Sequence, residues 1–139
     1  MERTAAQRAY LAVNIIFAGV ILLIMGYSFF YSPDVDKYPV PCIHETLTGQ
    51  PCPSCGLSHA FSLIVRGRFD EAAKWNGASG GVFLFFVFQL VMRVAMSLRA
   101  CKTDRHLRQI AASDAVLSSL TALAAFFPFL KALWLLLIR

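Results

Sequence analysis

Cysteine and histidine side chains concentrate in one short segment of the sequence. Cys52 and Cys55 form a Cys-Pro-Ser-Cys motif, with Cys42 and His44 before it and His59 after it. A thiolate is the nucleophile of thiol–disulfide exchange, and thiolate sulfur with imidazole nitrogen is a usual ligand set for zinc. The segment therefore predicts a site that makes a disulfide, binds a metal or exchanges electrons.

These three interpretations use the same residues differently. In the structural one, a disulfide or small turn motif pins a loop, and closing about ten to fifteen residues would stabilise it by roughly 3 kcal/mol. In the metal one, Cys42, Cys52 and Cys55 join His59 or His44 in a tetrahedral zinc site. In the redox one, Cys52 or Cys55 is the nucleophile and Cys42 resolves the mixed disulfide. The sequence assigns no catalytic residue and no certain cofactor.

The residues after the motif follow a helical period. On a wheel of 100° per residue, polar or reactive side chains share one face and apolar ones the opposite face. The first face holds Cys55, His59, Ser62 and Arg66, and the second holds Leu57, Ala60, Phe61 and Ile64. We predict a short amphipathic helix that lies at the outer surface of the membrane or dips partway into it, because it is too short to span.

The ends of this helix are also readable. The cysteine motif falls at its start, where unpaired amide groups and the helix dipole favour a thiolate. Gly67 is expected to end it, and Asp70 to cap a further turn that brings Trp75 to the interface.

The whole chain is suited to a bilayer. Of its 139 residues, 58% are hydrophobic and 15% charged, with a mean hydropathy of +0.60. We predict an all-α integral membrane protein, a single domain over residues 1–139, with three transmembrane helices at about 11–30, 78–98 and 115–138. The cysteine-rich loop is 32–77. The net charge of +5 is assigned to span ends, and nucleic acid is excluded as a partner.

Several polar residues interrupt these spans. Gln89 and Arg93 are four apart, so they share a face that is expected to meet another helix or the headgroups. Asn14 is expected to make a hydrogen bond between helices. Asp114 is interpreted as a helix-start cap, and Pro128 as a kink.

Basic residues predict the orientation. Arg99, Lys102, Arg105 and Arg108 crowd the segment between the second and third spans. Because cytoplasmic loops carry an excess of Lys and Arg, we expect this segment and the N-terminus inside and the cysteine-rich loop outside. Cys101 would then be a thiol on the cytoplasmic side.

The cysteine-rich segment resembles a bacterial family of small membrane proteins, the domain of unknown function 2752 family. The resemblance covers PCIHETLTGQPCPSCGLSHAFSLIVRGRFDEAAKWN, with matches at Cys42, Thr48, Gly49, Cys52, Pro53, Cys55, Gly56, Ala60, Gly67 and Asn76. Ser58, His59 and Gly77 depart from the pattern, which has Thr, Arg and Pro there. The resemblance implies a recognisable membrane module and supplies no reaction; the expected location is the bacterial inner (cytoplasmic) membrane.

Together these observations predict an accessory or assembly protein of the bacterial inner membrane. Its extracytoplasmic loop would be held by a disulfide or by a metal, and zinc is the candidate metal. The alternative is a membrane thiol–disulfide oxidoreductase that uses Cys52 and Cys55 with Cys42. The expected partners are the lipid bilayer and other membrane proteins.

Overall fold

The computed structural model describes residues 4–34, 46, 49, 52–102 and 106–138. Their backbone forms five helices and no strand. The chain divides into two compact units, which are described separately below. Unit 1 is formed by residues 1–24 and 84–124, and unit 2 by residues 25–83 and 125–139.

Three of the helices are long and apolar: α1 (Ala5–Phe30), α5 (Ser79–Lys102) and α6 (Leu107–Leu137). The stretches Ala5–Phe30, Ser79–Lys102 and Leu107–Leu135 are long and apolar enough to cross a membrane. The predicted all-α class and three spans are confirmed at this level. The helices begin before or end beyond the predicted spans, since helical backbone continues past an apolar run.

The surface of these helices supports the same conclusion. Large apolar side chains lie open on them, including Leu23 at 75% exposure and Phe30 at 84%. Soluble monomers rarely expose broad apolar patches, so this surface is suited to lipid.

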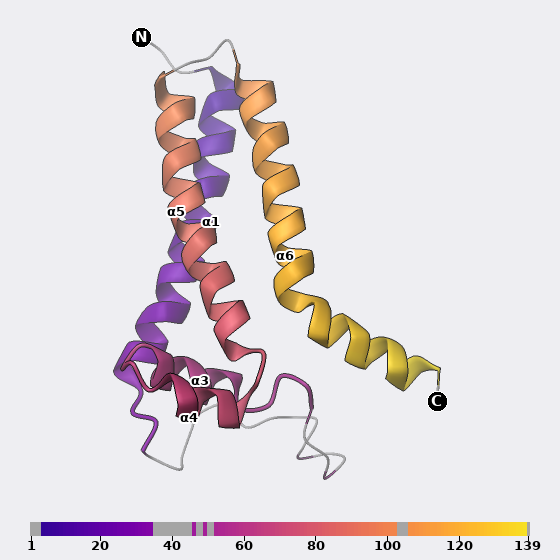
Figure 1. Cartoon of the computed structure of the whole chain (residues 1–139). Coiled ribbons are helices and arrows are strands. Elements are labelled where there is room, and N and C mark those ends of the chain that lie inside the picture. Colours follow the sequence, from indigo (N-terminus) through magenta and orange to yellow (C-terminus); the bar gives the residue numbers. More distant parts are fainter. Residues whose placement is uncertain (1–3, 35–45, 47–48, 50–51, 103–105, 139) are drawn as a thin grey trace. The chain divides into compact units, whose positions relative to one another are not determined.

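Unit 1 brings the first part of α1 beside the last part of α5 and the first part of α6 (Figure 1). The α1 helix begins at a cap, in which the Thr4 hydroxyl accepts a hydrogen bond from the Gln7 backbone N–H at 3.2 Å. The Gln7 side chain then donates to the carbonyl oxygen of Ala100 at 2.6 Å. This contact ties the start of α1 to the end of α5.

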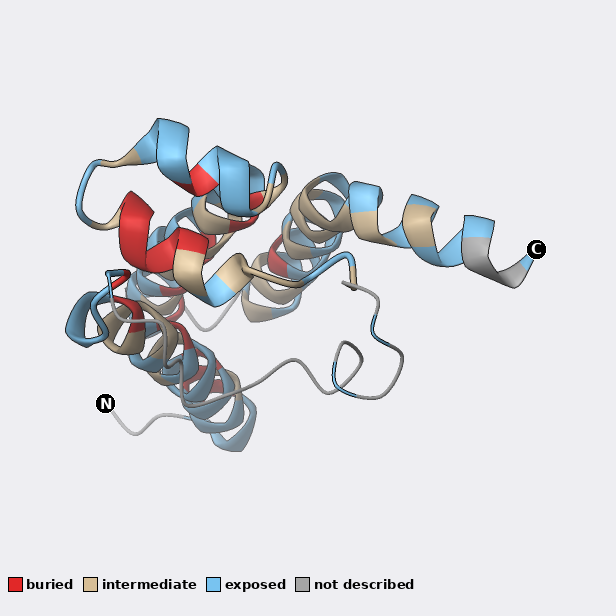
Figure 2. Ribbon diagram, turned by 90° about the horizontal axis from the view of Figure 1, so that it is seen from below, coloured by how far each residue is buried: buried red, intermediate tan, exposed pale blue. Residues whose placement is uncertain are grey.

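Unit 2 is organised around two short helices, α3 (Leu57–Ile64) and α4 (Phe69–Trp75). The second half of α3, from Ala60 to Ile64, is buried on all sides, as the red stretch of this helix shows in Figure 2. The Phe61 ring meets Phe83 edge to face with centroids 5.4 Å apart. The short helix thus forms the core of its unit.

Two predictions about these helices are wrong in detail. Ser62, predicted on the polar face, is fully buried, and its hydroxyl donates to the Ser58 carbonyl at 3.3 Å. Burial is tolerated because this bond satisfies the hydroxyl within the helix. Asp70 is not a cap, because α4 already begins at Phe69 and its N-cap is Arg68.

The predicted end of α3 at Gly67 is confirmed. Gly67 has φ +77°, its N–H bonds the Ile64 carbonyl at 2.9 Å, and the Arg68 N–H bonds the Leu63 carbonyl at 3.0 Å. These two bonds close the helix in a Schellman motif, which needs a left-handed residue at this position.

Candidate dithiol site

The Cys-Pro-Ser-Cys segment forms a closed turn in unit 2. The Cys55 N–H donates to the Cys52 carbonyl at 2.9 Å, and the Cys52 N–H donates to the Cys55 sulfur at 3.1 Å. The two sulfur atoms lie 3.2 Å apart, and the Ser54 hydroxyl lies 3.2 Å from the Cys52 sulfur. Since a disulfide bond measures about 2.05 Å, this is a thiol–thiol contact about 1 Å from bonding distance.

A side chain from α4's end holds this turn. The Asn76 amide nitrogen donates to the carbonyl oxygens of Pro53 at 3.0 Å and Cys55 at 3.1 Å. Its amide oxygen accepts from the Ala78 N–H at 3.0 Å. Asn76 therefore links the cysteine turn to the chain that leads into α5.

Gly56 makes the turn possible in this place. It has φ +76°, a left-handed conformation that side chains disfavour, and it caps α3. A Cβ atom there would lie 2.9 Å from the carbonyl oxygen of Trp75. The glycine after Cys55 thus allows α4's last turn to pack directly against the motif.

His59 lies one helical turn after Cys55 and stacks on Trp75. The ring centroids are 3.9 Å apart and the planes differ by 27°. Among the described residues, no group of three or more His, Cys, Asp and Glu side chains could hold a metal ion. The predicted ligands Cys42 and His44 lie outside the described residues, so the complete zinc set stays a prediction.

Two arginines tie neighbouring segments of unit 2 together. Arg66 donates to the last carbonyls of α1, at Ser28 (3.3 Å) and Phe29 (2.8 Å). Arg68 pairs with Glu71 at 2.7 Å and Asp34 at 2.9 Å. The hydrogen bond from Arg68 lowers the pKa of the Glu71 carboxyl, and the same contact raises the pKa of Arg68.

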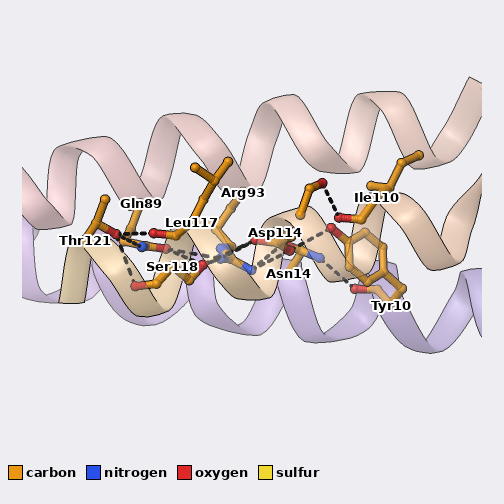
Figure 3. A network of polar contacts seen from close by, with 10 residues as sticks. Tyr10, Asn14, Gln89, Arg93, Ile110, Asp114, Leu117, Ser118 and Thr121 are labelled. Atoms are coloured by element: carbon orange, nitrogen blue, oxygen red, sulfur yellow. Dashed lines mark hydrogen bonds and ion pairs between the residues drawn. The ribbon is translucent and has the colours of Figure 1, made fainter. Parts of the chain in front are cut away.

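A second polar cluster lies in unit 1, across α1, α5 and α6 (Figure 3). The Arg93 guanidinium pairs with both carboxylate oxygens of Asp114, at 2.6 and 2.9 Å. It also donates to the side-chain oxygens of Asn14 at 3.0 Å, Gln89 at 3.1 Å and Ser118. The expected contact of the Gln89 and Arg93 face with another helix, and the expected hydrogen bond of Asn14, are confirmed.

The interpretation of Asp114 as a cap is wrong. The α6 helix begins at Leu107, and Asp114 is only 3% exposed inside it. The Tyr10 hydroxyl donates to it at 2.7 Å, in addition to the arginine. Its spacing to Ser118 and Thr121, one and two turns later, places three polar groups on one face. That pattern was the sequence signal for a buried polar helix contact.

The fold and these sites define a helical, multi-pass membrane protein that carries a cysteine turn beside a two-helix core. Residues 42–90 match the family described as "Protein of unknown function (DUF2752)". This match covers about a third of the chain and confirms the resemblance of that segment to the family. No curated protein and no solved structure matches the chain significantly.

Proposed function

We propose that the protein is a membrane accessory protein whose Cys52 and Cys55 exchange a disulfide with a partner protein. The observation that carries the proposal is the 3.2 Å separation of the two sulfur atoms in a turn that Asn76 holds from outside. Closing the disulfide requires little movement of either residue. Preorganisation of this kind lowers the cost of forming the bond.

A disulfide of the partner protein accepts the electrons and protons that the two turn cysteines lose. A thiolate of Cys52 or Cys55 attacks a disulfide sulfur of the partner, and the partner's other sulfur leaves as a thiolate. The second cysteine of the turn then attacks the mixed disulfide and releases the partner. The two thiols of the turn lose two electrons and two protons, and the partner's disulfide becomes two thiols.

The backbone around the motif supports the thiolate. The Cys52 N–H points at the Cys55 sulfur, and a hydrogen bond to sulfur stabilises its negative charge. Cys42 is the proposed alternative resolving thiol: it would attack the mixed disulfide in place of the second turn cysteine and release the partner's thiolate.

The proposed compartment is the extracytoplasmic side of a bacterial inner membrane, with the N-terminus in the cytoplasm. Arg99 and Lys102 in the last turn of α5 support this orientation, since basic residues collect at cytoplasmic ends. An exterior thiol pair meets an oxidising environment, where disulfides form and persist. The proposed interfacial position of α3 follows from its place within the loop between the first two spans.

The test is a trapping experiment in cells. Single variants Cys52→Ser and Cys55→Ser are expressed with Cys42→Ser and Cys101→Ser in the same full-length chain. One of the two should accumulate a mixed disulfide with a partner, visible as a heavier band that a reductant removes. The variant without both turn cysteines is the control.

Two results would overturn the proposal. One is a Cys52–Cys55 disulfide that is complete in every preparation and resists reduction while the protein stays folded, which would make it structural. The other is one zinc ion per chain in gently purified protein, lost on Cys52→Ser, which would make the site a metal centre.

A further inference from the structure

Unit 1 contains a cavity that the cysteine site does not use. Its volume is about 500 Å³, within the range of pockets that hold small organic molecules. The walls are mainly apolar and include three aromatic rings, and one end is polar. The rings are Phe17, Phe85 and Phe86, and the polar end has Gln89, Arg93 and Ser118.

The charge at the polar end is already balanced. Arg93 and Asp114 share two close contacts, at 2.6 and 2.9 Å, and Asp114 also accepts from Tyr10. An anionic ligand would have to displace this carboxylate or sit beside it without a free countercharge. The cavity is therefore suited to a neutral ligand.

The polar end still offers hydrogen-bond donors. The Nε–H of Arg93 makes no hydrogen bond within the part of the chain that the structure describes, and Arg93 is only 8% exposed. Gln89 uses one amide hydrogen on Thr121 at 3.1 Å and has a second. Donors without acceptors favour a ligand that brings a carbonyl oxygen.

The cavity is within reach of the lipid-exposed surface. Phe17 and Val20 line it and are 55% and 49% exposed. The centroid of the Phe17 ring lies 5.8 Å from the Cζ atom of Arg93, so the aromatic wall continues to the polar end. We propose that this cavity binds a neutral, membrane-dissolved molecule with a hydrocarbon body and a carbonyl-bearing head, the chemistry shared by isoprenoid quinones and diacylglycerols.

The test is native mass spectrometry of the full-length protein released from a nonionic detergent. Decylubiquinone and dioctanoylglycerol are titrated separately, and decylbenzene serves as a probe with the same kind of body and no carbonyl. At least one carbonyl-bearing probe should bind as one molecule per chain, and the tighter of the two identifies the source. Decylbenzene should bind about tenfold more weakly or worse, since about 1.4 kcal/mol of hydrogen bonding gives a tenfold change.

A matched pair of variants tests whether the ligand binds in the cavity. Ala122 lines it, while Ala124 lies exposed two residues later on the same helix. Ala122→Phe should weaken binding at least about tenfold by filling the space, and Ala124→Phe should leave it within about twofold. The probe comparison uses the unaltered chain and needs no variant to fold.

Each opposite result would overturn the inference. Equal binding of decylbenzene would show an apolar cavity without a polar role. Unchanged binding in a folded Ala122→Phe variant would place the ligand elsewhere. Tighter binding of dioctanoyl phosphatidic acid than of dioctanoylglycerol would mean that the Arg93 charge is not neutralised, and binding of neither carbonyl probe would refute the site.

Discussion

Removing the side chain of Asn76 is expected to weaken the Cys52–Cys55 disulfide. In the reduced protein, Asn76 donates two hydrogen bonds to the turn, at 3.0 and 3.1 Å. Each net hydrogen bond contributes about 0.5–1.5 kcal/mol, so the pair contributes about 1–3 kcal/mol. A disulfide holds the turn by itself, whereas the reduced turn depends on Asn76 to stay ordered. Without Asn76, closing the disulfide must order the turn as well.

The expected change in the free energy of disulfide formation lies at the lower end of this range. Asn76 is only partly buried, and water can replace part of what the amide supplies. We expect Asn76→Ala to lower the equilibrium constant for disulfide formation by about tenfold, which corresponds to about 1.4 kcal/mol. The assay equilibrates the protein, with Cys42→Ser and Cys101→Ser, against reduced and oxidised dithiothreitol and counts thiols by a mass-tagging alkylant.

Asn76→Asp separates the two roles of this side chain. It keeps an oxygen that accepts from the Ala78 N–H, but it loses the N–H groups that reach the turn. It should therefore weaken the disulfide at least as much as Asn76→Ala. An equilibrium constant within twofold of the parent protein in both variants would refute the reasoning that Asn76 organises the dithiol.

Three further predictions follow from the same geometry. Gly56→Ala should lower the thermal midpoint more than Gly67→Ala, because both have positive φ but only Gly56 would place a Cβ 2.9 Å from a carbonyl oxygen; equal midpoints in detergent would contradict this. Arg93→Met should destabilise the helix contact by about 3–5 kcal/mol because it leaves a buried carboxylate unpaired, and adding Asp114→Leu should recover most of the loss; chemical unfolding of the parent protein and the two variants measures this. Glu71 has a lowered pKa in the folded protein, so its contribution to stability is present above the ordinary carboxyl pKa of 4.5 and is lost as the pH falls through the folded pKa. Glu71→Gln should therefore flatten the decline in thermal midpoint between about pH 6 and about pH 3.

The sequence was sufficient to predict the elements. Long, mainly apolar runs predicted α1, α5 and α6, because a bilayer requires about twenty such residues. Gly67 fixed the end of α3, because only glycine adopts that conformation at little cost. The spacing of Gln89 and Arg93 predicted a shared face, which the contact with Asn14 and Asp114 confirms.

The contacts between distant segments could not be predicted in the same way. Asn76 reaches back to Pro53 and Cys55, and nothing in local periodicity says that the end of α4 meets the cysteine turn. The error at Asp114 has a related cause. An apolar run marks where lipid contact begins, and the α6 backbone is already helical from Leu107. A carboxylate near the start of such a run can therefore be deep inside a helix.

The ion pair of Arg93 and Asp114 also constrains how the chain is made. On insertion scales, a single charged residue at the centre of a span costs about 2.5–3.5 kcal/mol, and a charge nearer the end of its apolar run, as Arg93 and Asp114 are, costs less but still disfavours insertion of α5 or α6 alone. If α5 and α6 insert together as a helical hairpin, Arg93 and Asp114 neutralise each other before either meets lipid. A nascent chain that ends after α5 would retain a solitary guanidinium among acyl chains.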